Sequence, residues 1–382
     1  MRDVLGPADR VSAVGGVVRD ALLGLPPGGD VDLVVEGDAL ALARRIGRAL
    51  GARVTTHDRF GTAAIELPHG DGHLDVVMAR RESYAAPGAL PDVAPGTLAD
   101  DLARRDLTIN AIALRLSGPG AGELVDPHGG AADLRAGLVR LLRPDAFAED
   151  PSRLVRAARY AARLGFALEP VTEGAARAAA PALDPASARV ADELRRLLEE
   201  DAAAAAAELL DALGVPWIAA PPDGLAARIA ALDAAASAPG APDVPRWSLR
   251  LGAAVTAAGR ERLAVAGWAR AVAREAAEGP ALAAALAAAG RPSEVDRLLR
   301  AAPAATALGA LAAGADAVAR WWGGDRDRRP AVDGAALVAA GVAPGPVIGR
   351  ALAAVRAALI DGEVASPAEQ LALALRVARE EG

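Results

Sequence analysis

Segments typical of β-strands are confined to about the first 145 residues of the chain, and this constrains the fold more than any other feature. Short apolar runs and alternating patterns predict strands at 11–14, 30–35, 53–56, 62–67, 73–79 and 123–126. Helical periodicity predicts helices at 17–24, 38–50 and 97–116. From about residue 146 onward the sequence is rich in Ala and Leu with Gly and Pro breaks, which is typical of helices. The sequence therefore predicts an α/β or α+β head followed by an all-α remainder.

The chain of 382 residues is long enough for several units. We expect a head at 1–145, a helical neck at 146–205, a helical body at 206–315 and a helical tail at 316–382. The apolar run 301–319 carries one charge, Asp316, but it is mostly Ala and is interrupted by Pro and Gly. It therefore predicts a buried helical pair and no membrane span. The absence of cysteine and of a secretory signal favours a cytoplasmic protein.

The net charge of −7 is mild evidence against a general nucleic-acid binder, although phosphate contacts require only a local basic stripe. All basic residues are Arg, and the chain contains no Lys. Together with the abundance of Ala, Gly and Pro, this indicates a GC-rich genome. The single Asn of the chain, Asn110, lies in one of the few segments that depart from this bias.

The first such segment begins with Gly15 and Gly16, which lie where a predicted strand turns into a helix. Glycines there let the backbone approach a ligand closely, and the N-terminus of the helix suits phosphate. Arg19 lies one turn into that helix. Asp30 and Asp32 follow on a predicted strand, where their spacing puts both carboxylates on one face. Two hard oxygen ligands on one face suit Mg²⁺ when a triphosphate completes its shell.

A second segment opens the predicted neck. Asp150 is a candidate N-cap, and Arg153, Arg156 and Arg159 follow at intervals of three residues along one helix face. Cytosine and adenine each present an amino donor beside a ring-nitrogen acceptor. A carboxylate and a guanidinium, here Asp150 and Arg153, can therefore read both bases and reject G and U.

These segments resemble the class II CCA-adding tRNA nucleotidyltransferases and bacterial poly(A) polymerases. The resemblance implies an α+β, polymerase-β-like head with a mixed sheet, and an enzyme that transfers CMP and AMP from CTP and ATP to the 3′ end of tRNA with Mg²⁺ on Asp30 and Asp32. It makes Asp75 the candidate third carboxylate. It also implies that Arg105 holds the triphosphate, that Asp106 accepts a hydrogen bond from a ribose hydroxyl, and that Asn110 orders the loop or the sugar.

The same resemblance assigns base reading to Asp150 and Arg153, and nucleotide support to Arg156 and Arg159. It implies a mobile loop within 79–96 that helps to switch from C to A addition, and a tail that holds tRNA. The turn at 25–29 is slightly longer than is usual for the family.

Other functions fit the same motifs. A poly(A) polymerase, or a partial enzyme that adds only CC or only A, would share the head. A non-catalytic RNA-binding protein with a relic head is an alternative of another class, although the intact Asp30 and Asp32 argue against it. A nucleotidyltransferase acting on small molecules would not require the long helical part. The oligomeric state is left open by the sequence.

Overall fold

The computed structural model describes residues 4–6, 8–26, 28–58, 61–68, 72–83, 92–219 and 224–380. The chain forms two compact units. The first comprises Met1–Asp184 and Asp192–Pro216, and the second comprises Pro185–Ala191 and Trp217–Gly382. These units do not test the predicted boundaries near 145, 205 and 315, which stay predictions.

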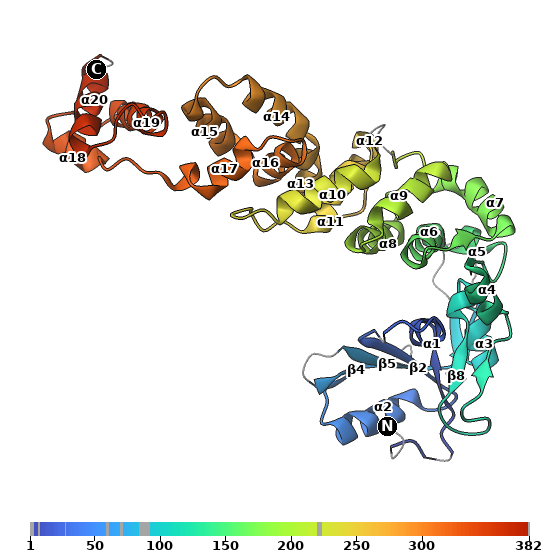
Figure 1. Ribbon diagram of the computed structural model, residues 1–382. Helices are drawn as coiled ribbons and strands as arrows, with labels where there is room; N and C mark the ends of the chain where they lie inside the picture. The colour runs from blue at the N-terminus through green and yellow to red at the C-terminus, as the bar shows by residue number, and fades with distance from the viewer. Residues whose placement is uncertain are drawn as a thin grey trace. The chain divides into compact units, whose positions relative to one another are not determined.

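A seven-stranded mixed sheet forms the centre of the first unit, in the order β3-β4-β5-β2-β1-β8-β9 (Figure 1). Its only parallel pair is β2 with β5, among the strands that the structure describes. The mixed sheet of the α+β head is therefore confirmed. The strands are β1 (Val11–Val14), β2 (Asp30–Val35), β3 (Val54–His57), β4 (Thr62–Glu66), β5 (His73–Met78), β8 (Ala113–Arg115) and β9 (Leu124–Val125).

Two predicted helices of the head form where expected. α1 (Gly16–Leu22) follows the glycine turn after β1. α2 (Ala39–Leu50) begins at Asp38, whose side chain accepts a 2.9 Å hydrogen bond from the Ala41 amide, and ends at Gly51 in the left-handed conformation. Its apolar side, including Leu42 and Ile46, is buried. The helix packs along β4 and β5 (Figure 1).

The predicted helix over 97–116 is only partly correct. α3 (Leu98–Ala103) begins at a capping box formed by Thr97 and Asp100. The helix then stops, and a 3-10 turn (Thr108–Asn110) leads into β8. The side chain of Asp106 accepts a 2.7 Å hydrogen bond from the Leu107 amide, a local bond that competes with helix continuation.

The segment predicted as a mobile loop contains two strands. β6 (Arg80–Ser83) and β7 (Asp92–Pro95) pair antiparallel. The remaining residues of that predicted loop, 84–91, lie outside the described residues.

The first unit continues with short helices. α6 begins at Ser152, one residue later than an N-cap at Asp150 would require, and Asp150 instead accepts bonds from the amide and hydroxyl of Ser152 at 3.1 and 2.6 Å. A two-residue parallel pair, β10 (Leu138–Val139) with β11 (Ala167–Leu168), extends strand structure past residue 146. The helices are α4 (Gly130–Ala136), α5 (Ala146–Glu149), α6 (Ser152–Leu164), α7 (Pro170–Ala179), α8 (Ala188–Glu199), which belongs to this unit from Asp192 onward, and α9 (Ala203–Ala212).

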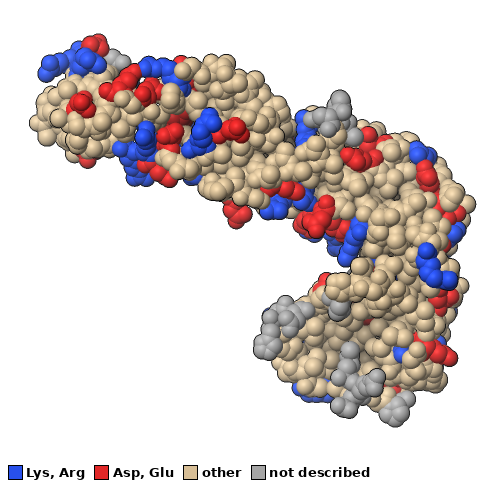
Figure 2. Space-filling view, in the orientation of Figure 1, with Lys and Arg blue, Asp and Glu red and all other residues tan. Residues whose placement is uncertain are grey.

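The second unit is helical. Its helices are α10 (Leu225–Ala236), α11 (Arg246–Ala254), α12 (Ala257–Arg262), α13 (Gly267–Ala277), α14 (Gly279–Ala288), α15 (Pro292–Ala301), α16 (Ala304–Ala312), α17 (Ala317–Gly323), α18 (Gly334–Ala339), α19 (Pro346–Ile360) and α20 (Pro367–Glu380). Arginine and acidic side chains are interspersed over its surface on the face drawn in Figure 2.

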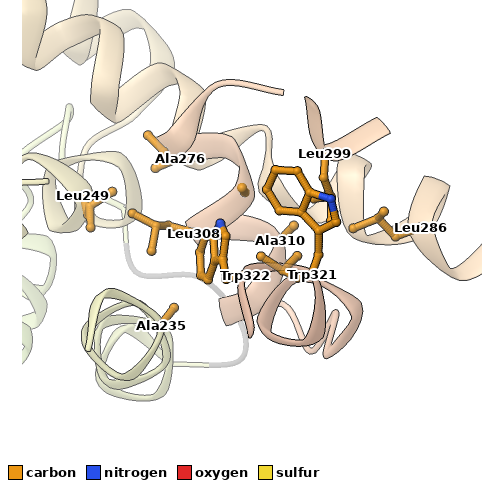
Figure 3. Close-up of a cluster of buried hydrophobic side chains, with 12 residues drawn as sticks. Ala235, Leu249, Ala276, Leu286, Leu299, Leu308, Ala310, Trp321 and Trp322 are labelled. Atoms are coloured by element: carbon orange, nitrogen blue, oxygen red, sulfur yellow. The ribbon is translucent and has the colours of Figure 1, made fainter. Parts of the chain in front are cut away.

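The apolar run 301–319 forms α16 and the start of α17, and both helices belong to one buried core. Figure 3 shows Leu308 and Ala310 of α16 in this core with Trp321 and Trp322 of α17. The predicted helical pair is confirmed. Within the described residues, no helix has the length and apolar character needed to cross a bilayer.

Candidate active site

Two carboxylates face each other across the parallel strands. The register of β2 and β5 sets Asp32 opposite Asp75, and Asp30 opposite His73. His73 contacts the carboxylates of Asp30 and Asp75. Its Nδ1 lies 2.8 Å from Asp30 Oδ1, and its Nε2 lies 3.3 Å from Asp75 Oδ2. The structure thus brings all three predicted carboxylates together at the start of adjacent strands.

The face that carries Asp30 and Asp32 continues to Val34, because alternate residues of a strand share a face. Val34 is buried in a cluster with Leu98 and Leu102 of α3. Apolar packing on the same face therefore anchors the strand beyond the two carboxylates, whose own side chains lie at its exposed end.

Asp32 has a pKa raised above its ordinary value of 3.8. The largest cause is the loss of water around the carboxylate, and the neighbouring charges of Asp75 and Asp30 act in the same direction. The neighbouring Arg105 and His73 side chains oppose the shift. An excess of negative charge at one point is the environment that a divalent cation neutralises, so the residues present fit Mg²⁺.

The protein side chains alone do not complete the coordination shell of a metal ion. Among the described residues, no group of three or more His, Asp or Glu side chains is arranged to hold a metal ion. Mg²⁺ commonly binds one or two protein carboxylates and takes its other ligands from water and substrate phosphates. The site therefore fits a cation that arrives with a nucleotide.

The turn at Gly15 lies next to these carboxylates. Its backbone has φ +70°, which favours glycine. A Cβ atom there would lie 2.9 Å from Nη1 of Arg105 and 3.7 Å from Oδ2 of Asp32. At Gly16 it would lie 3.6 Å from Nη2 of Arg19. The lack of a side chain at Gly15 therefore leaves room for Arg105, whereas a Cβ atom at Gly16 would make only an ordinary contact with Arg19.

Arg105 is held in place by acceptors on its own segment. Nε and Nη2 donate to Asp101 Oδ2 at 3.3 and 3.1 Å, and Nη1 donates to the Asn110 carbonyl at 3.3 Å. Asp101 is fully buried, and the sequence did not identify it. The guanidinium is therefore oriented near Asp32 before any ligand binds.

Asn110 connects the head's first helix to Asp106. Its Oδ1 accepts a 2.7 Å bond from Arg19 Nη1, and its Nδ2 donates to Asp106 Oδ1 at 3.5 Å. Arg19 is only 2% exposed, and it also pairs with Asp20 at 2.8 Å. Direct phosphate binding by Arg19 stays a prediction, while its contacts in the structure support Asn110.

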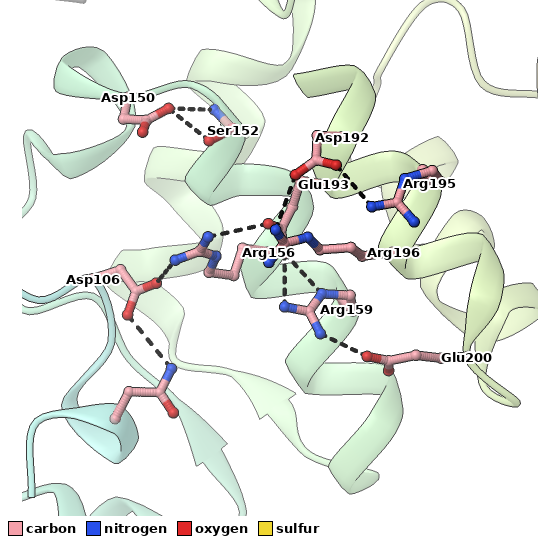
Figure 4. Close-up of polar contacts among 11 residues, drawn as sticks. Asp106, Asp150, Ser152, Arg156, Arg159, Asp192, Glu193, Arg195, Arg196 and Glu200 are labelled. Carbon is pink, nitrogen blue, oxygen red and sulfur yellow. Dashed lines mark hydrogen bonds and ion pairs between the residues drawn. The ribbon is translucent and has the colours of Figure 1, made fainter. Parts of the chain in front are cut away.

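A second network joins the head to α6 and α8 (Figure 4). Arg156 Nη1 donates to Asp106 Oδ2 at 3.0 Å, and Arg156 Nη2 donates to Glu193 Oε2 at 3.1 Å. Arg159 donates to Glu193 Oε1 at 2.8 Å and to Glu200 Oε1 at 2.6 Å. Glu193 is 3% exposed and is shared by both arginines. Nothing in the local spacing pointed to Glu193, because its partners lie 34 and 37 residues away.

The charges in this network shift the pKa of its members. Burial alone would raise the pKa of Asp106, but the Arg156 guanidinium and the hydrogen bonds from the Leu107 amide and the Asn110 side chain together outweigh burial, and the net shift is downward. Burial opposes the charged form of Arg156 and Arg159, but their carboxylate partners outweigh burial and raise both pKa values. The network therefore favours the charged forms of Asp106, Arg156 and Arg159.

The predicted base-reading residues lie at the start of α6. Asp150 accepts from Ser152, and Arg153 Nη1 donates to Glu149 Oε2 at 3.1 Å. Arg143 Nη2 pairs with the same oxygen of Glu149. Asp150 and Arg153 are thus one helical turn apart, with the guanidinium of Arg153 fixed by a carboxylate.

Comparison with known proteins agrees with this geometry. Residues 11–140 match the family model described as the poly A polymerase head domain, and residues 165–216 match the one described as a probable RNA and SrmB-binding site of polymerase A. Over these two segments the chain is therefore similar to polymerases of the poly(A) polymerase type.

Relatives of this chain are named for different activities. An A-adding tRNA nucleotidyltransferase of Halalkalibacterium halodurans is 47% identical over 180 residues, which is 47% of this chain and 42% of that protein. A CC-adding tRNA nucleotidyltransferase of Deinococcus radiodurans is 46% identical over 210 residues, which is 55% of each protein. The chain therefore spans about half the length of these relatives or less.

Solved structures of CCA-adding enzymes resemble this protein over nearly its whole length. One apo form has a TM-score of 0.81 at 27% identity and covers 96% of this chain and 92% of its own. The Thermotoga maritima CCA-adding enzyme complexed with tRNA has a TM-score of 0.74 at 26% identity, over 96% of this chain and 91% of its own. The helical part thus has the fold found in these CCA-adding enzymes.

Proposed function

We propose that this protein is a CCA-adding tRNA nucleotidyltransferase, which transfers CMP and AMP from CTP and ATP to the 3′ end of tRNA and releases pyrophosphate. The observation that carries the proposal is the pairing of Asp32 with Asp75 across parallel strands, with Asp30 on the same face as Asp32. Similar CCA-adding enzymes have been solved with ATP, with CTP and with tRNA, which supports these substrates and partners.

In this proposal Asp30 and Asp32 hold Mg²⁺, which would supply a Lewis acid for the attacking 3′ hydroxyl and for the triphosphate. Asp75 is the proposed third carboxylate, placed to accept the proton of that hydroxyl. The Gly15–Gly16 turn and Arg105, with Arg19 behind it, face the triphosphate. The charge of Arg105 opposes the raised pKa of Asp32 and so favours the ionised ligand.

The nucleotide would be selected without a template. Asp106 and Asn110 would contact the ribose, and Asp150 and Arg153 would read the amino group and ring nitrogen shared by C and A. Arg156 and Arg159 support this arrangement through Asp106 and Glu193. The helical residues 316–382 would hold tRNA, and the cell compartment we expect is the cytoplasm.

The test is incorporation of labelled CTP or ATP into tRNAs that lack CCA, that end in CC, or that end in CCA. A CCA-adding enzyme extends the first with both nucleotides and the second with one A, and leaves the third unchanged. Asp30→Asn and Asp32→Asn should each lose at least about a hundredfold in rate while tRNA binding is kept. Retained turnover would refute the metal assignment.

The nearest alternatives are a CC-adding or A-adding enzyme, because relatives with both activities are similar to this chain. A CC-adding enzyme would stop after two C residues, and an A-adding enzyme would extend only the tRNA that ends in CC. Growth beyond one A would indicate a poly(A) polymerase. Tight tRNA binding without any incorporation would indicate a non-catalytic RNA-binding protein.

A further inference from the structure

The ring of Tyr160, on α6, is contacted by two guanidinium groups. Cζ of Arg19, from α1, lies 4.9 Å from the centre of the ring, and Cζ of Arg159 lies 4.7 Å from it. A cation within about 6 Å of an aromatic face is attracted by the negative charge of that face. Tyr160 is therefore a direct electrostatic contact between the head and α6.

This contact closes a circuit of side chains. Arg156 and Tyr160 are four residues apart on α6, so they lie on the same face of the helix. Arg156 binds Asp106 at 3.0 Å, Asp106 accepts from Asn110 at 3.5 Å, and Asn110 accepts from Arg19 at 2.7 Å. Arg19 then returns to α6 at Tyr160. The segment around Asp106 and Asn110 is thus held to α6 by two contacts. One is direct, from Arg156 to Asp106, and the other runs through Arg19 to Tyr160.

The ring also helps to satisfy a buried charge. Arg19 is 2% exposed, and among its described contacts one is a carboxylate, Asp20, while Asn110 is neutral. A buried cation requires more than one favourable partner to offset the loss of water. Without an electron-rich ring at residue 160, the guanidinium would move toward solvent and draw the Asn110 amide with it.

We propose that Tyr160 is a positioning residue that keeps the ribose-contacting residues of the head at a fixed distance from the base-reading residues of α6. This inference rests on the proposed function. Ribose and base belong to one nucleotide, so the residues expected to contact them, Asp106 with Asn110 and Asp150 with Arg153, must keep a constant separation. The circuit through Tyr160 supplies that constraint without Tyr160 touching the nucleotide.

The test is the ratio of kcat/KM for CTP to that for 2′-deoxy-CTP, measured with a tRNA that lacks CCA. In Tyr160→Phe the ring face remains, and the ratio should match wild type. Replacement of Tyr160 by pentafluorophenylalanine keeps the ring shape but reverses its charge distribution, and Tyr160→Leu removes the ring. Both should lower the ratio by on the order of fivefold, mainly through a higher KM for CTP.

The fluorinated variant preserves packing, so it decides the question even where the leucine variant does not fold. An unchanged ratio in this variant would overturn the inference. If kcat/KM falls equally for CTP and 2′-deoxy-CTP, Tyr160 has only a general stabilising role, and if neither value falls, the ring has no role in positioning. Absence of incorporation by the wild-type protein would instead overturn the proposed function. The two failures are therefore distinct.

Discussion

A Cβ atom on Gly15 would lie 2.9 Å from Nη1 of Arg105, closer than carbon and nitrogen normally approach. The same turn has φ +70°, a conformation that costs a residue with a side chain about 1–2 kcal/mol. Gly15→Ala should therefore strain the backbone and displace the guanidinium from its position beside Asp32. We expect a loss of stability of about 1–2 kcal/mol by chemical denaturation, and a loss of nucleotide incorporation of at least about tenfold.

Gly24→Ala is the matched control for this substitution. Gly24 has φ +68°, but a Cβ atom there would meet no atom within 4 Å. Gly24→Ala should lower the free energy of unfolding by a similar amount and leave nucleotide incorporation close to that of the wild type. If both variants lost activity equally, backbone strain alone would account for the effect and the contact with Arg105 would not matter.

Asp32→Asn should abolish incorporation but stabilise the folded protein. Lost hydration and the charges of Asp75 and Asp30 raise the pKa of Asp32 in the folded state above 3.8. The ionised carboxylate therefore destabilises the fold above that raised pKa, and the penalty disappears as pH falls below 3.8. At pH 7 we expect a gain of up to about 1 kcal/mol, limited by the partial exposure of Asp32.

The gain should be measured by thermal unfolding in the absence of divalent cations, at pH 7 and at pH 3.5. It should shrink at the lower pH, where the wild-type carboxylate is protonated. A loss of stability at pH 7 would show that Asp32 makes a favourable contact as an ion, which contradicts the raised pKa.

Arg156→Gln should be destabilising, because it leaves the buried carboxylates of Asp106 and Glu193 without their shared cation. Because the Arg156 side chain is 37% exposed, solvent screening reduces the cost, and a loss of about 1–3 kcal/mol is expected for leaving these carboxylates without it. Arg156 lowers the pKa of Asp106, so the ionised Asp106 stabilises the wild type above 3.8, and this contribution disappears as pH falls through the lowered folded-state pKa. The difference in free energy of unfolding between the variant and the wild type should thus become smaller at acidic pH.

Arg163→Gln, on the same helix, serves as the control. Arg163 is 46% exposed and its ion pair with Glu200 is 3.7 Å long, so its loss should cost under about 1 kcal/mol. Comparable losses at residues 156 and 163 would indicate a general effect of charge removal on α6.

In the second unit, Asp296 is a buried acceptor for three helices. Its carboxylate accepts from Trp321 Nε1 at 2.7 Å and from Arg356 at 2.8 Å, and it pairs with Arg300 at 3.1 Å. Asp296→Asn should cost about 2–4 kcal/mol by denaturation and change the near-ultraviolet circular dichroism of tryptophan. Asp316→Asn, at an exposed site in the same unit, should change neither.

Local patterns predicted the first part of the head well. The strands at residues 11–14 and 30–35 and the glycine turn between them follow from apolar runs and from residues with special backbone needs. The same rules gave a wrong prediction over 97–116. The helical periodicity of the sequence continues past Ala103, but the helix ends there. The side chain of Asp106 there bonds to the next amide, and this local choice ended the helix.

The partners of the predicted site residues were much less accessible to sequence reasoning. Asp101 could have been found as the acidic residue four positions before Arg105 on a helix. Glu193 and Tyr160 could not, because their contacts join segments that only tertiary packing brings together. Spacing along the chain thus identified the groups that would face a ligand, but not the groups that hold them.

The circuit formed by Arg19, Asn110, Asp106, Arg156 and Tyr160 also limits how this protein can be recombined with its relatives. Two of its members lie on α6 and three lie in the head. A chimera joined between Asn110 and α6 would inherit one half from each parent. Such a hybrid should work only where both parents carry compatible side chains at all five positions, so a crossover after α6 is the better choice.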